Sequence, residues 1–264
     1  MLDRLYGKIQ NLRNSFYEKG IFASHSLGAK TVSIGNITVG GTGKTPLVAF
    51  VAGILAEAGE KVCILSRGYG RKNPKSRVLV SDGEEVLVEA EFAGDEPFEL
   101  ANKLSGKAIV VSDANRISAA KFALEKFGVT AFVLDDAFQH QKAKRDLNIV
   151  CTDATNPFGN GKMLPFGILR EPLENLKRAD AIVITRANLS NKIEILKAEI
   201  KQYTNCPIFI SNNKISSLSE LENFPAKTKD QRPKTKDRTA FAFCALGNPD
   251  NFFEQLKSEN FKLV

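Results

Sequence analysis

The segment Ser33–Phe50, with the sequence SIGNITVGGTGKTPLVAF, places the strongest constraint on how this chain folds. It joins a short β-branched run to an apolar stretch with helical periodicity, and a glycine-rich turn lies at the junction. Gly40, Gly41 and Gly43 allow tight backbone turns, so that N–H groups can approach an anion closely. The helix expected to begin at Thr45 directs the positive end of its dipole at the same point. The segment therefore predicts a strand–loop–helix unit that binds phosphate.

The last residues of this turn follow the pattern of a nucleotide-binding P-loop. Lys44 can reach the β- and γ-phosphates, the Thr45 hydroxyl can ligate Mg²⁺, and Pro46 fits a first helical turn. The full motif has glycine where this chain has Thr38, which is a departure from the pattern. A turn without a ligand is the alternative interpretation. The nucleotide-binding residues that we predict are Gly40, Gly41, Thr42, Gly43, Lys44 and Thr45.

Short apolar runs alternate with helical patterns along most of the chain. Strands are expected at Thr31–Ile34, Lys61–Leu65, Lys107–Val111, Val129–Leu134, Leu147–Cys151, Asp180–Thr185, Pro207–Ile210 and Thr239–Cys244. Helices are expected at Thr45–Ala58, Glu96–Leu104, Ala114–Phe127, Lys192–Tyr203 and Asn251–Lys257. Two further runs, Arg77–Val80 and Glu85–Val88, flank an Asp-Gly pair that is typical of a hairpin turn. This alternation predicts an α/β fold of the P-loop NTPase type, with a mostly parallel sheet and helices on both faces.

Composition narrows the classes of partner and compartment. The 37 Lys and Arg residues against 30 Asp and Glu give a net charge of +7, which suits a nucleotide, a nucleic acid or an acidic lipid surface. The 4 cysteines lie far apart without a Cys-x-x-Cys pair, so we expect reduced cysteines and no zinc site. Neither a membrane-spanning apolar run nor a signal peptide is recognisable. These features favour a cytosolic protein.

Apolar residues near the N-terminus recur at helical spacing, which predicts an amphipathic helix within residues 1–20. The apolar positions are Leu2, Leu5, Ile9, Leu12 and Phe16, and the basic residues beside them are Arg4, Lys8, Arg13 and Lys19. Such a helix can lie in the headgroup layer of an anionic membrane. Packing against the protein core is the alternative.

Two acidic residues follow a predicted buried strand in the stretch TAFVLDDAFQH. Asp135 and Asp136 are therefore expected at the carboxyl edge of the sheet, beside the phosphate loop, where open α/β sheets bind ligands. One of them should organise Mg²⁺, directly or through water. A turn or helix-capping role is the alternative. His140, close behind, can orient a carboxylate or contact a substrate, although a lone histidine can equally be structural.

Asp95 comes directly before a predicted helix that has Pro97 in its first turn. Taken alone, this spacing favours an N-capping role for Asp95 over a functional one.

Other polar residues also stand beside predicted elements. Tyr69 lies in a basic turn after a strand, where a solvated turn is the alternative. Arg116 follows another strand, and there Asp113 is a competing candidate for a helix cap. Arg170 ends the long Gly- and Pro-rich loop Asn156–Pro172; it can bind a phosphate bidentately or be a plain surface residue.

Several stretches together resemble one enzyme family. GNITVGGTGKTP, LSRGYGR, GDEP, DDAFQH, RDLNIV, PFGNGKMLPFGILREP and ALGNP follow the order and spacing of the tetraacyldisaccharide 4′-kinases, the lipid A kinases of Gram-negative bacteria. The resemblance implies a P-loop kinase that uses ATP and Mg²⁺ to phosphorylate the 4′-hydroxyl of a tetraacyldisaccharide 1-phosphate. It also implies two α/β/α domains with the active site between them. We place the nucleotide-binding domain at residues 1–150 and a smaller second domain at residues 151–264.

The same resemblance implies roles for individual residues. Lys44 and Asp136 are assigned to catalysis together with Asp95, which becomes the candidate base for the sugar hydroxyl instead of a cap. Thr45, Asp135 and Asp136 are assigned to Mg²⁺. The residues expected to line the substrate or phosphate site are Tyr69, Arg116, Gln139, His140, Arg170 and Glu171.

The resemblance also implies partners and a location. An anionic glycolipid is the expected substrate, and the protein is expected as a peripheral protein on the cytoplasmic face of the inner membrane. No nucleic acid and no obligate protein partner is expected. Asn248 departs from relatives that carry histidine there, and the chain stops where relatives usually continue, so we expect an incomplete second domain.

Two other functions fit a P-loop in this setting. One is a kinase of a soluble small molecule, and the other is an ATPase switch or metal-insertion chaperone. The loop GGTGKT resembles those of such ATPases, but Val39 stands where many of them carry an additional lysine.

Overall fold

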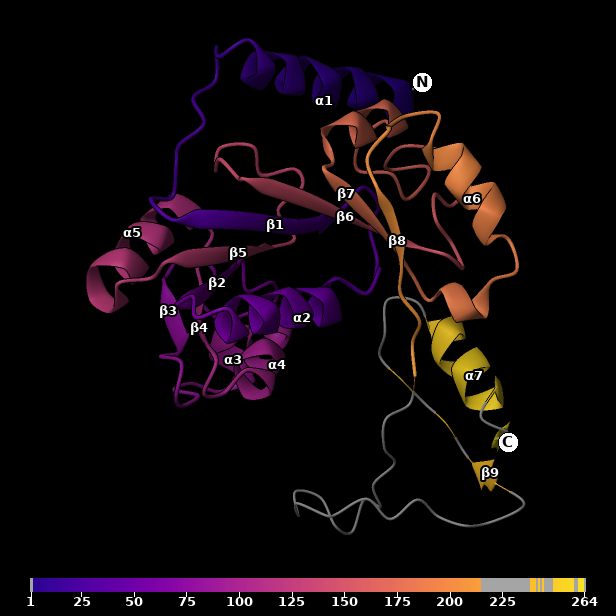
Figure 1. The fold of residues 1–264 in the computed structure, drawn as a ribbon. Helices are drawn as coiled ribbons and strands as arrows, with labels where there is room; N and C mark the ends of the chain where they lie inside the picture. Colours follow the sequence, from indigo (N-terminus) through magenta and orange to yellow (C-terminus); the bar gives the residue numbers. More distant parts are fainter. Residues whose placement is uncertain are drawn as a thin grey trace.

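A single sheet forms the centre of the protein (Figure 1). The computed structural model describes residues 2–214, 238–240, 242, 244, 249–258 and 261–263. Within these residues the sheet has 8 strands in the order β3-β4-β2-β5-β1-β6-β7-β8. The strands are β1 (Lys30–Asn36), β2 (Val62–Ser66), β3 (Val78–Ser81), β4 (Ala108–Ser112), β5 (Ala131–Asp135), β6 (Leu147–Asp153), β7 (Ala181–Thr185) and β8 (Ile208–Ile210). Only β3 runs antiparallel to its neighbour, so the predicted mostly parallel sheet is confirmed.

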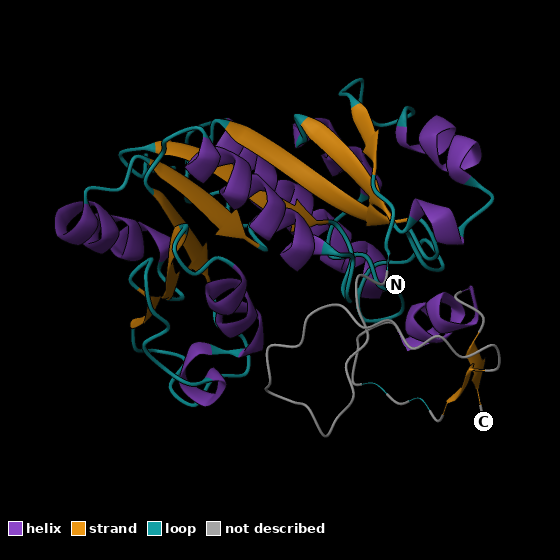
Figure 2. Ribbon diagram, turned by 60° about the horizontal axis from the view of Figure 1, so that its bottom comes forward, coloured by secondary structure: helices purple, strands orange, loops and turns teal. Residues whose placement is uncertain are grey.

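Helices cover both faces of this sheet (Figure 2). Ile64 of β2 packs in one cluster with residues of α2 (Lys44–Glu57) and α4 (Asp95–Lys103). Its neighbours Cys63 and Leu65 point the other way and pack with α5 (Arg116–Phe127). Side chains alternate between the faces of a strand, so a strand buried on both sides reads as a continuous apolar run. The remaining helices are α1 (Leu2–Glu18), α3 (Ala90–Ala93), α6 (Ile193–Ile200), α7 (Pro249–Ser258) and the 3₁₀ helices η1 (Leu173–Arg178) and η2 (Ala187–Leu189).

The sheet continues across residue 150, which lies inside β6. β6 pairs with β1 on one side and with β7 on the other, and β8 extends the same sheet. A separate pair of parallel strands, β9 (Arg238–Ala240) and β10 (Phe261–Leu263), lies beyond it in sequence. The division into domains at residue 150 stays a prediction. Asn248 lies outside the described residues.

The predicted hairpin between Arg77–Val80 and Glu85–Val88 is only partly present. Its first arm forms β3, but β3 pairs with β4, and the second arm forms no strand. A bridge between Ser81 and Val86 and a hydrogen bond from Leu87 N to Val80 O remain of the pairing. The buried side of β3, with Val80 fully buried, packs at the edge of the large sheet, which offers more apolar contact than a free hairpin.

Helix α1 forms as predicted, and four of its five predicted apolar positions face outward, whereas Phe16 is half-buried. Leu2, Leu5, Ile9 and Leu12 are all more than half exposed, whereas Asn14 is buried. This exposure contradicts the alternative in which the apolar face packs on the core. None of the described helices combines the length and the apolar character that crossing a membrane requires.

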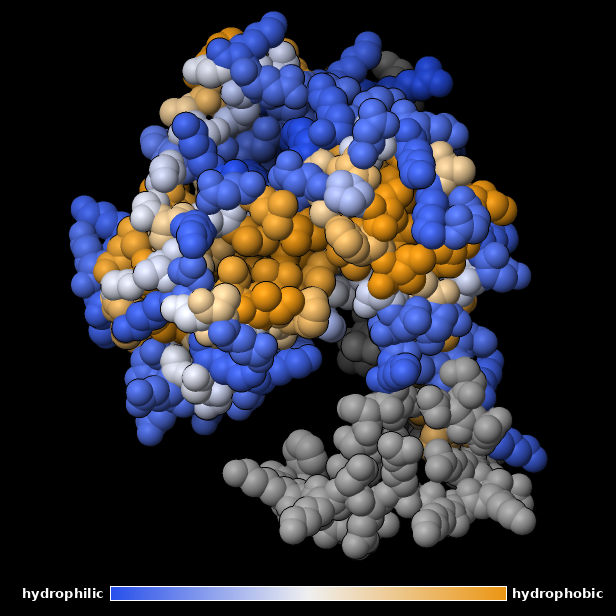
Figure 3. Space-filling model, viewed as in Figure 1, coloured by the Kyte–Doolittle hydropathy of each residue, from blue (hydrophilic) through white to orange (hydrophobic). Residues whose placement is uncertain are grey.

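Apolar side chains also gather elsewhere on the surface. Figure 3 shows such patches over α2 and near β8 and α6. Phe50 and Ile54 of α2 are exposed, as are Phe209 of β8 and Ile195 of α6.

Candidate functional site

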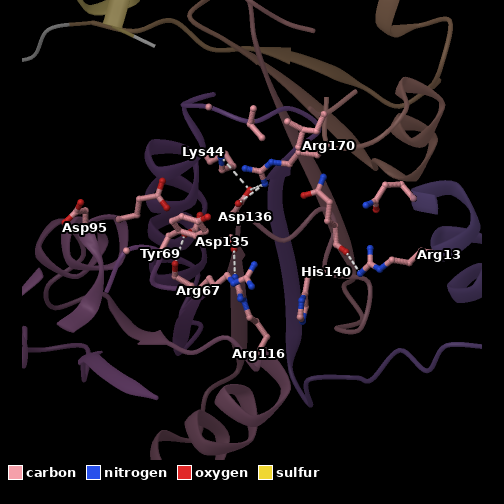
Figure 4. Close-up of a pocket in the computed structure, with 18 of the residues that line it drawn as sticks. Arg13, Lys44, Arg67, Tyr69, Asp95, Arg116, Asp135, Asp136, His140 and Arg170 are labelled. Atoms are coloured by element: carbon pink, nitrogen blue, oxygen red, sulfur yellow. Dashed lines mark hydrogen bonds and ion pairs between the residues drawn. The ribbon is translucent and has the colours of Figure 1, made fainter. Parts of the chain in front are cut away.

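A cavity of about 1030 Å³ lies at the carboxyl ends of β2 and β5, beside the start of α2 (Figure 4). Parallel strands end at the same edge of a sheet, so the polar residues that follow them meet there. The cavity brings together most of the predicted site residues, from segments far apart in the sequence. Those that line it are Gly40, Lys44, Tyr69, Asp95, Arg116, Asp135, Asp136, Gln139, His140 and Arg170.

The phosphate loop owes its shape to its glycines. Gly40 and Gly43 have φ values of 106° and 77°, in the left-handed region that favours glycine. Gly43 is the N-cap of α2, and no described side chain caps this helix end. The backbone N–H groups of the first turn are thereby left for a ligand.

Thr38, the departure from the P-loop pattern, has a structural explanation. It is buried and forms an isolated bridge with Leu169. Hydrogen bonds from Val39 N to Ile168 O and from Arg170 N to Ile37 O continue this pairing. The pairing ties the start of the phosphate loop to the Gly- and Pro-rich loop and carries Arg170 into the cavity.

The two neighbouring aspartates have different surroundings. Asp135 ends β5, is 1% exposed and accepts a hydrogen bond from Ser66 Oγ at 2.8 Å. Its other oxygen, Oδ1, is buried without a hydrogen-bond partner among the described residues. Asp136 has a φ of 48° and turns its side chain toward Lys44 and Arg170. Arg170 Nη1 donates to both of its oxygens at 2.9 Å, and Lys44 Nζ lies 3.6 Å from Oδ1.

These surroundings move the two carboxyl pKa values in opposite directions. Burial raises the pKa of Asp135 to about 6, and the negative charge of Glu96 adds to the effect. Burial also opposes ionisation of Asp136, but the positive charges of Lys44 and Arg170 outweigh it and lower its pKa. Asp136 is therefore a stable anion, whereas Asp135 is a carboxyl group that gains from a nearby cation.

Arg116, Gln139 and His140 form another part of the cavity wall. Arg116 begins α5 and is 3% exposed, and its Nη2 donates to Asp135 O at 3.2 Å. Gln139 Nε2 donates to Asn36 O. Burial lowers the pKa of His140 to about 4, and the positive charge of Arg116 acts in the same direction. His140 is thus neutral near pH 7.

Asp95 is an exposed residue on the α4 side of the cavity (Figure 4). Its expected capping role is wrong: the N-cap of α4 is Gly94, with a φ of 90°, and no described side chain caps the helix. The helix begins one residue earlier than the spacing suggested, so the Asp95 side chain stands at the cavity mouth instead. The Asp113 capping alternative is also wrong, because Asn115 caps α5 by accepting from Ser118 N.

Glu96 is a cavity residue that sequence reasoning did not select. Desolvation in the cavity raises its pKa, against the opposing positive charge of Lys44. The signal was present in the stretch GDEP, because two adjacent acids at a helix start can both face one cavity.

Helix α1 supplies a further part of the wall, through Tyr6, Gln10 and Arg13. Arg13 Nη2 donates to Gln139 O at 3.0 Å. The sequence pattern marked Arg13 only as part of a basic face, since its contact lies more than a hundred residues away along the chain.

Five predicted residues do not line the cavity: Gly41, Thr42, Gly43, Thr45 and Glu171. The first four continue the phosphate loop into α2. Glu171 is fully buried, accepts from Asn14 Nδ2 at 2.7 Å and forms an ion pair with Arg178. It therefore holds α1 against the protein.

The sequence matches a known family over its whole length. The profile described as tetraacyldisaccharide-1-P 4′-kinase covers residues 1–264. Tetraacyldisaccharide 4′-kinase of Desulfotalea psychrophila is 38% identical, in an alignment that covers 100% of this chain and 74% of that protein. The enzyme of the same name from Geobacter sulfurreducens is 43% identical, covering 98% of this chain and 70% of that protein.

A solved structure has the same fold. The crystal structure of LpxK from Aquifex aeolicus in complex with ATP matches with a TM-score of 0.75 at 33% identity, over 100% of this chain and 79% of that one. The family match, the two relatives and this fold agree with one another. The chain belongs to the tetraacyldisaccharide-1-P 4′-kinase family.

Proposed function

We propose that this protein transfers the γ-phosphate of ATP to the 4′-hydroxyl of a tetraacyldisaccharide 1-phosphate. The observation that carries the proposal is that Lys44, Asp136 and Asp95 line one cavity. A phosphate-binding group and a candidate base must share such a space if a sugar hydroxyl is to reach a bound nucleotide. Membership of the family makes this acceptor the leading one.

The phosphate loop is the proposed triphosphate site. Lys44 is 7% exposed, and its ammonium group is held beside Asp136 in a poorly solvated place where its charge acts strongly on phosphate oxygens. The N–H groups at the start of α2, which no described side chain caps, add donors to the same anion. Phosphoryl transfer needs mainly such positioning and charge neutralisation from the protein.

Mg²⁺ fits the residues at this edge. No group of three His, Cys, Asp or Glu side chains in the described part of the chain forms a dedicated metal cage. Mg²⁺ in kinases is usually held by one or two carboxylates together with phosphates and water. Asp135 has a buried oxygen without a hydrogen-bond partner in the described part of the chain, and Thr45 is the P-loop hydroxyl. Together with Asp136 they would hold the ion. The ion would neutralise charge on the β- and γ-phosphate oxygens.

The acceptor sugar would lie between Asp95 and the Arg116–His140 wall. Asp95 would accept the proton of the attacking hydroxyl. His140, which is neutral, offers hydrogen bonds to a sugar without a charge, and Arg116 offers a buried cation. Tyr69 is 83% exposed at the mouth, where its ring can pack against a sugar. Gln139 and Arg170 complete this side.

Helix α1 is the proposed membrane contact. Its outward apolar residues would enter the headgroup layer, with nearby lysines and arginines attracted to anionic lipid. Its inner side reaches the cavity through Arg13. A lipid substrate could then keep its acyl chains in the bilayer while its sugars enter the site.

The direct test is transfer of ³²P from γ-labelled ATP to tetraacyldisaccharide 1-phosphate in mixed micelles. We expect labelled lipid that depends on the acceptor and on Lys44. ATP hydrolysis that is equally fast without acceptor would favour the ATPase switch, and transfer to water-soluble sugars alone would favour a soluble-substrate kinase.

A further inference from the structure

Residues at the carboxyl ends of β6 and β7 hold the phosphate loop from behind. Thr185 Oγ1, at the end of β7, donates to Thr42 O at 2.9 Å. Arg186 Nη1, one residue later, donates to Gly41 O at 2.7 Å. Both contacts span more than 140 residues of sequence. The loop is thus anchored to a part of the sheet that contributes nothing to the cavity lining.

These contacts fall on the carbonyl groups of the loop. A loop that points successive N–H groups at an anion must turn its carbonyl groups away from it. Carbonyl groups turned into the protein need donors, since an unpaired buried polar group destabilises that arrangement. Thr42 is 5% exposed, so its carbonyl has little access to water. Thr185 supplies the donor to this buried carbonyl, Arg186 donates to the exposed carbonyl of Gly41, and Asn36 Nδ2 donates to the Thr42 hydroxyl.

Arg186 is itself fixed. Its backbone has a φ of 55°, in the left-handed region that a non-glycine residue seldom adopts. The same Nη1 that reaches Gly41 forms an ion pair with Asp153 at the end of β6, and the Arg186 side chain is only 15% exposed. Asp153 also accepts from the backbone N–H and the hydroxyl of Thr155. These contacts hold the Arg186 side chain in one orientation toward the phosphate loop.

Thr185 fits the loop by shape as well as by hydrogen bonding. A Cβ atom added at Gly43 would lie 3.3 Å from Thr185 Cγ2, so the threonine methyl packs directly behind the residue that caps α2. The hydroxyl and the methyl of Thr185 therefore act on adjacent loop residues.

We propose that Thr185 and the Arg186–Asp153 pair are positioning residues of the phosphate loop, which hold its carbonyl groups away from bound nucleotide triphosphate. The proposal rests on the proposed nucleotide site. It assigns these residues to affinity for the nucleotide and not to contact with the reacting atoms. Their loss should therefore weaken nucleotide binding and leave binding of the acceptor unchanged.

The test compares variants that differ in one donor. Thr185→Val removes the hydroxyl and keeps the shape, whereas Thr185→Ser keeps the hydroxyl. Arg186→Met removes the guanidinium, and Arg186→Lys keeps a charge. Arg77→Met is the matched control. Arg77 Nε lies 2.9 Å from Asp113 Oδ2 in an ion pair, and neither residue lines the cavity. Titration calorimetry with Mg·ATP gives Kd, and steady-state kinetics give KM for each substrate and kcat.

We expect Thr185→Val and Arg186→Met to raise the Kd and KM for ATP by about tenfold to a hundredfold, the usual effect of losing a hydrogen bond to a buried group or charge. The KM for the acceptor should stay within about twofold of wild type, Thr185→Ser should restore nucleotide binding, and Arg77→Met should not change it.

Wild-type Kd for ATP in Thr185→Val would overturn the proposal. Equal weakening by Thr185→Ser or by Arg77→Met would also overturn it, because the effect would then be general destabilisation. If Arg186→Met does not fold, the Thr185 pair and Arg186→Lys still decide the question. A wild-type chain that binds Mg·ATP without phosphorylating the lipid would refute the kinase proposal and leave these comparisons valid.

Discussion

Arg170 and Asp136 lie 34 residues apart in sequence and meet in the cavity, where one guanidinium nitrogen donates to both carboxylate oxygens at 2.9 Å. The contact depends on the pairing of Ile37–Val39 with Ile168–Arg170, which carries the end of a long loop to the phosphate-binding edge. Asp136 thus receives a second positive charge besides Lys44. The positive charges of Lys44, Arg170 and Arg116 together favour the ionised form of Asp136.

Replacing Arg170 should move the pH dependence of the reaction. In Arg170→Gln, burial of Asp136 is opposed only by the positive charges of Lys44 and Arg116, so the pKa of Asp136 rises. The acidic limb of the profile of kcat/KM against pH should shift to higher pH, and kcat/KM at pH 7 should fall by about tenfold to a hundredfold. Arg170→Lys keeps the charge and should leave the limb in place. An unchanged limb in Arg170→Gln would show that Asp136 does not govern it.

Asp95 should affect turnover without affecting nucleotide affinity. Asp95→Asn removes a proton acceptor from the cavity mouth, and general bases typically contribute roughly 10²–10⁴-fold to rate. We expect kcat to fall in that range while the Kd for Mg·ATP, measured by calorimetry, stays at the wild-type value. Lys44→Ala should abolish turnover and weaken nucleotide binding. Glu99→Gln is the control and should keep kcat within about twofold, because Glu99 is exposed one turn further along the same helix and does not line the cavity.

Asp135 and Asp136 should have opposite effects on stability against pH. The pKa of Asp135 is about 6 in the folded protein and near 3.8 when unfolded, so the folded state binds its proton more tightly. Its contribution to stability is fully present below about pH 4 and is lost as pH rises through 6. At pH 8 the free energy of unfolding of Asp135→Asn should therefore exceed that of wild type by up to about 3 kcal/mol, with a higher melting temperature. At pH 4 the variant and wild type should be equally stable.

The neighbouring residue is the matched control for that measurement. The lowered pKa of Asp136 gives stability that is present above its unfolded value and lost as pH falls through the lower folded value. Asp136→Asn should therefore destabilise the protein at pH 8, where Asp135→Asn stabilises it. Both are measured by thermal melting of nucleotide-free protein, and a destabilised Asp135→Asn at pH 8 would contradict the raised pKa assigned to this buried carboxyl.

The local sequence pattern was sufficient to predict the mostly parallel sheet and the phosphate loop, because both are encoded in short, contiguous stretches of residues. Apolar runs such as Ala131–Leu134 identify buried strands, and glycine at position 43 marks a left-handed turn before a helix. Asp135 and Asp136 follow such a run directly, so their place at the sheet edge could be predicted too. Short-range signals of this kind fail at the ends of elements, as at Gly94, which caps α4 where Asp95 was expected. They also fail to predict strand partners, since β3 pairs with β4 and not with the run Glu85–Val88.

Contacts between distant segments leave no such mark. Glu171 was expected near the substrate, yet it is paired with Asn14 and Arg178. The residues next to Glu171 in the sequence do not indicate these partners. Arg13 reaches Gln139 across 126 residues, and Arg186 reaches the phosphate loop across 145. A charged residue in a surface pattern and one in a long-range contact look the same in sequence. These roles required the packing of α1 and of β7.

Helix α1 should determine membrane binding through its outward leucines. Leu5 and Leu12 are 54% and 55% exposed, so replacing both by glutamine removes apolar surface for a bilayer without opening a cavity in the protein. The fraction of Leu5→Gln/Leu12→Gln protein that sediments with anionic vesicles should fall by about tenfold or more, while the melting temperature stays near wild type. Phe50→Gln is the control, because Phe50 is 63% exposed on α2 and away from α1. Sedimentation that is unchanged by the leucine substitutions, or reduced equally by Phe50→Gln, would show that another surface docks on the membrane.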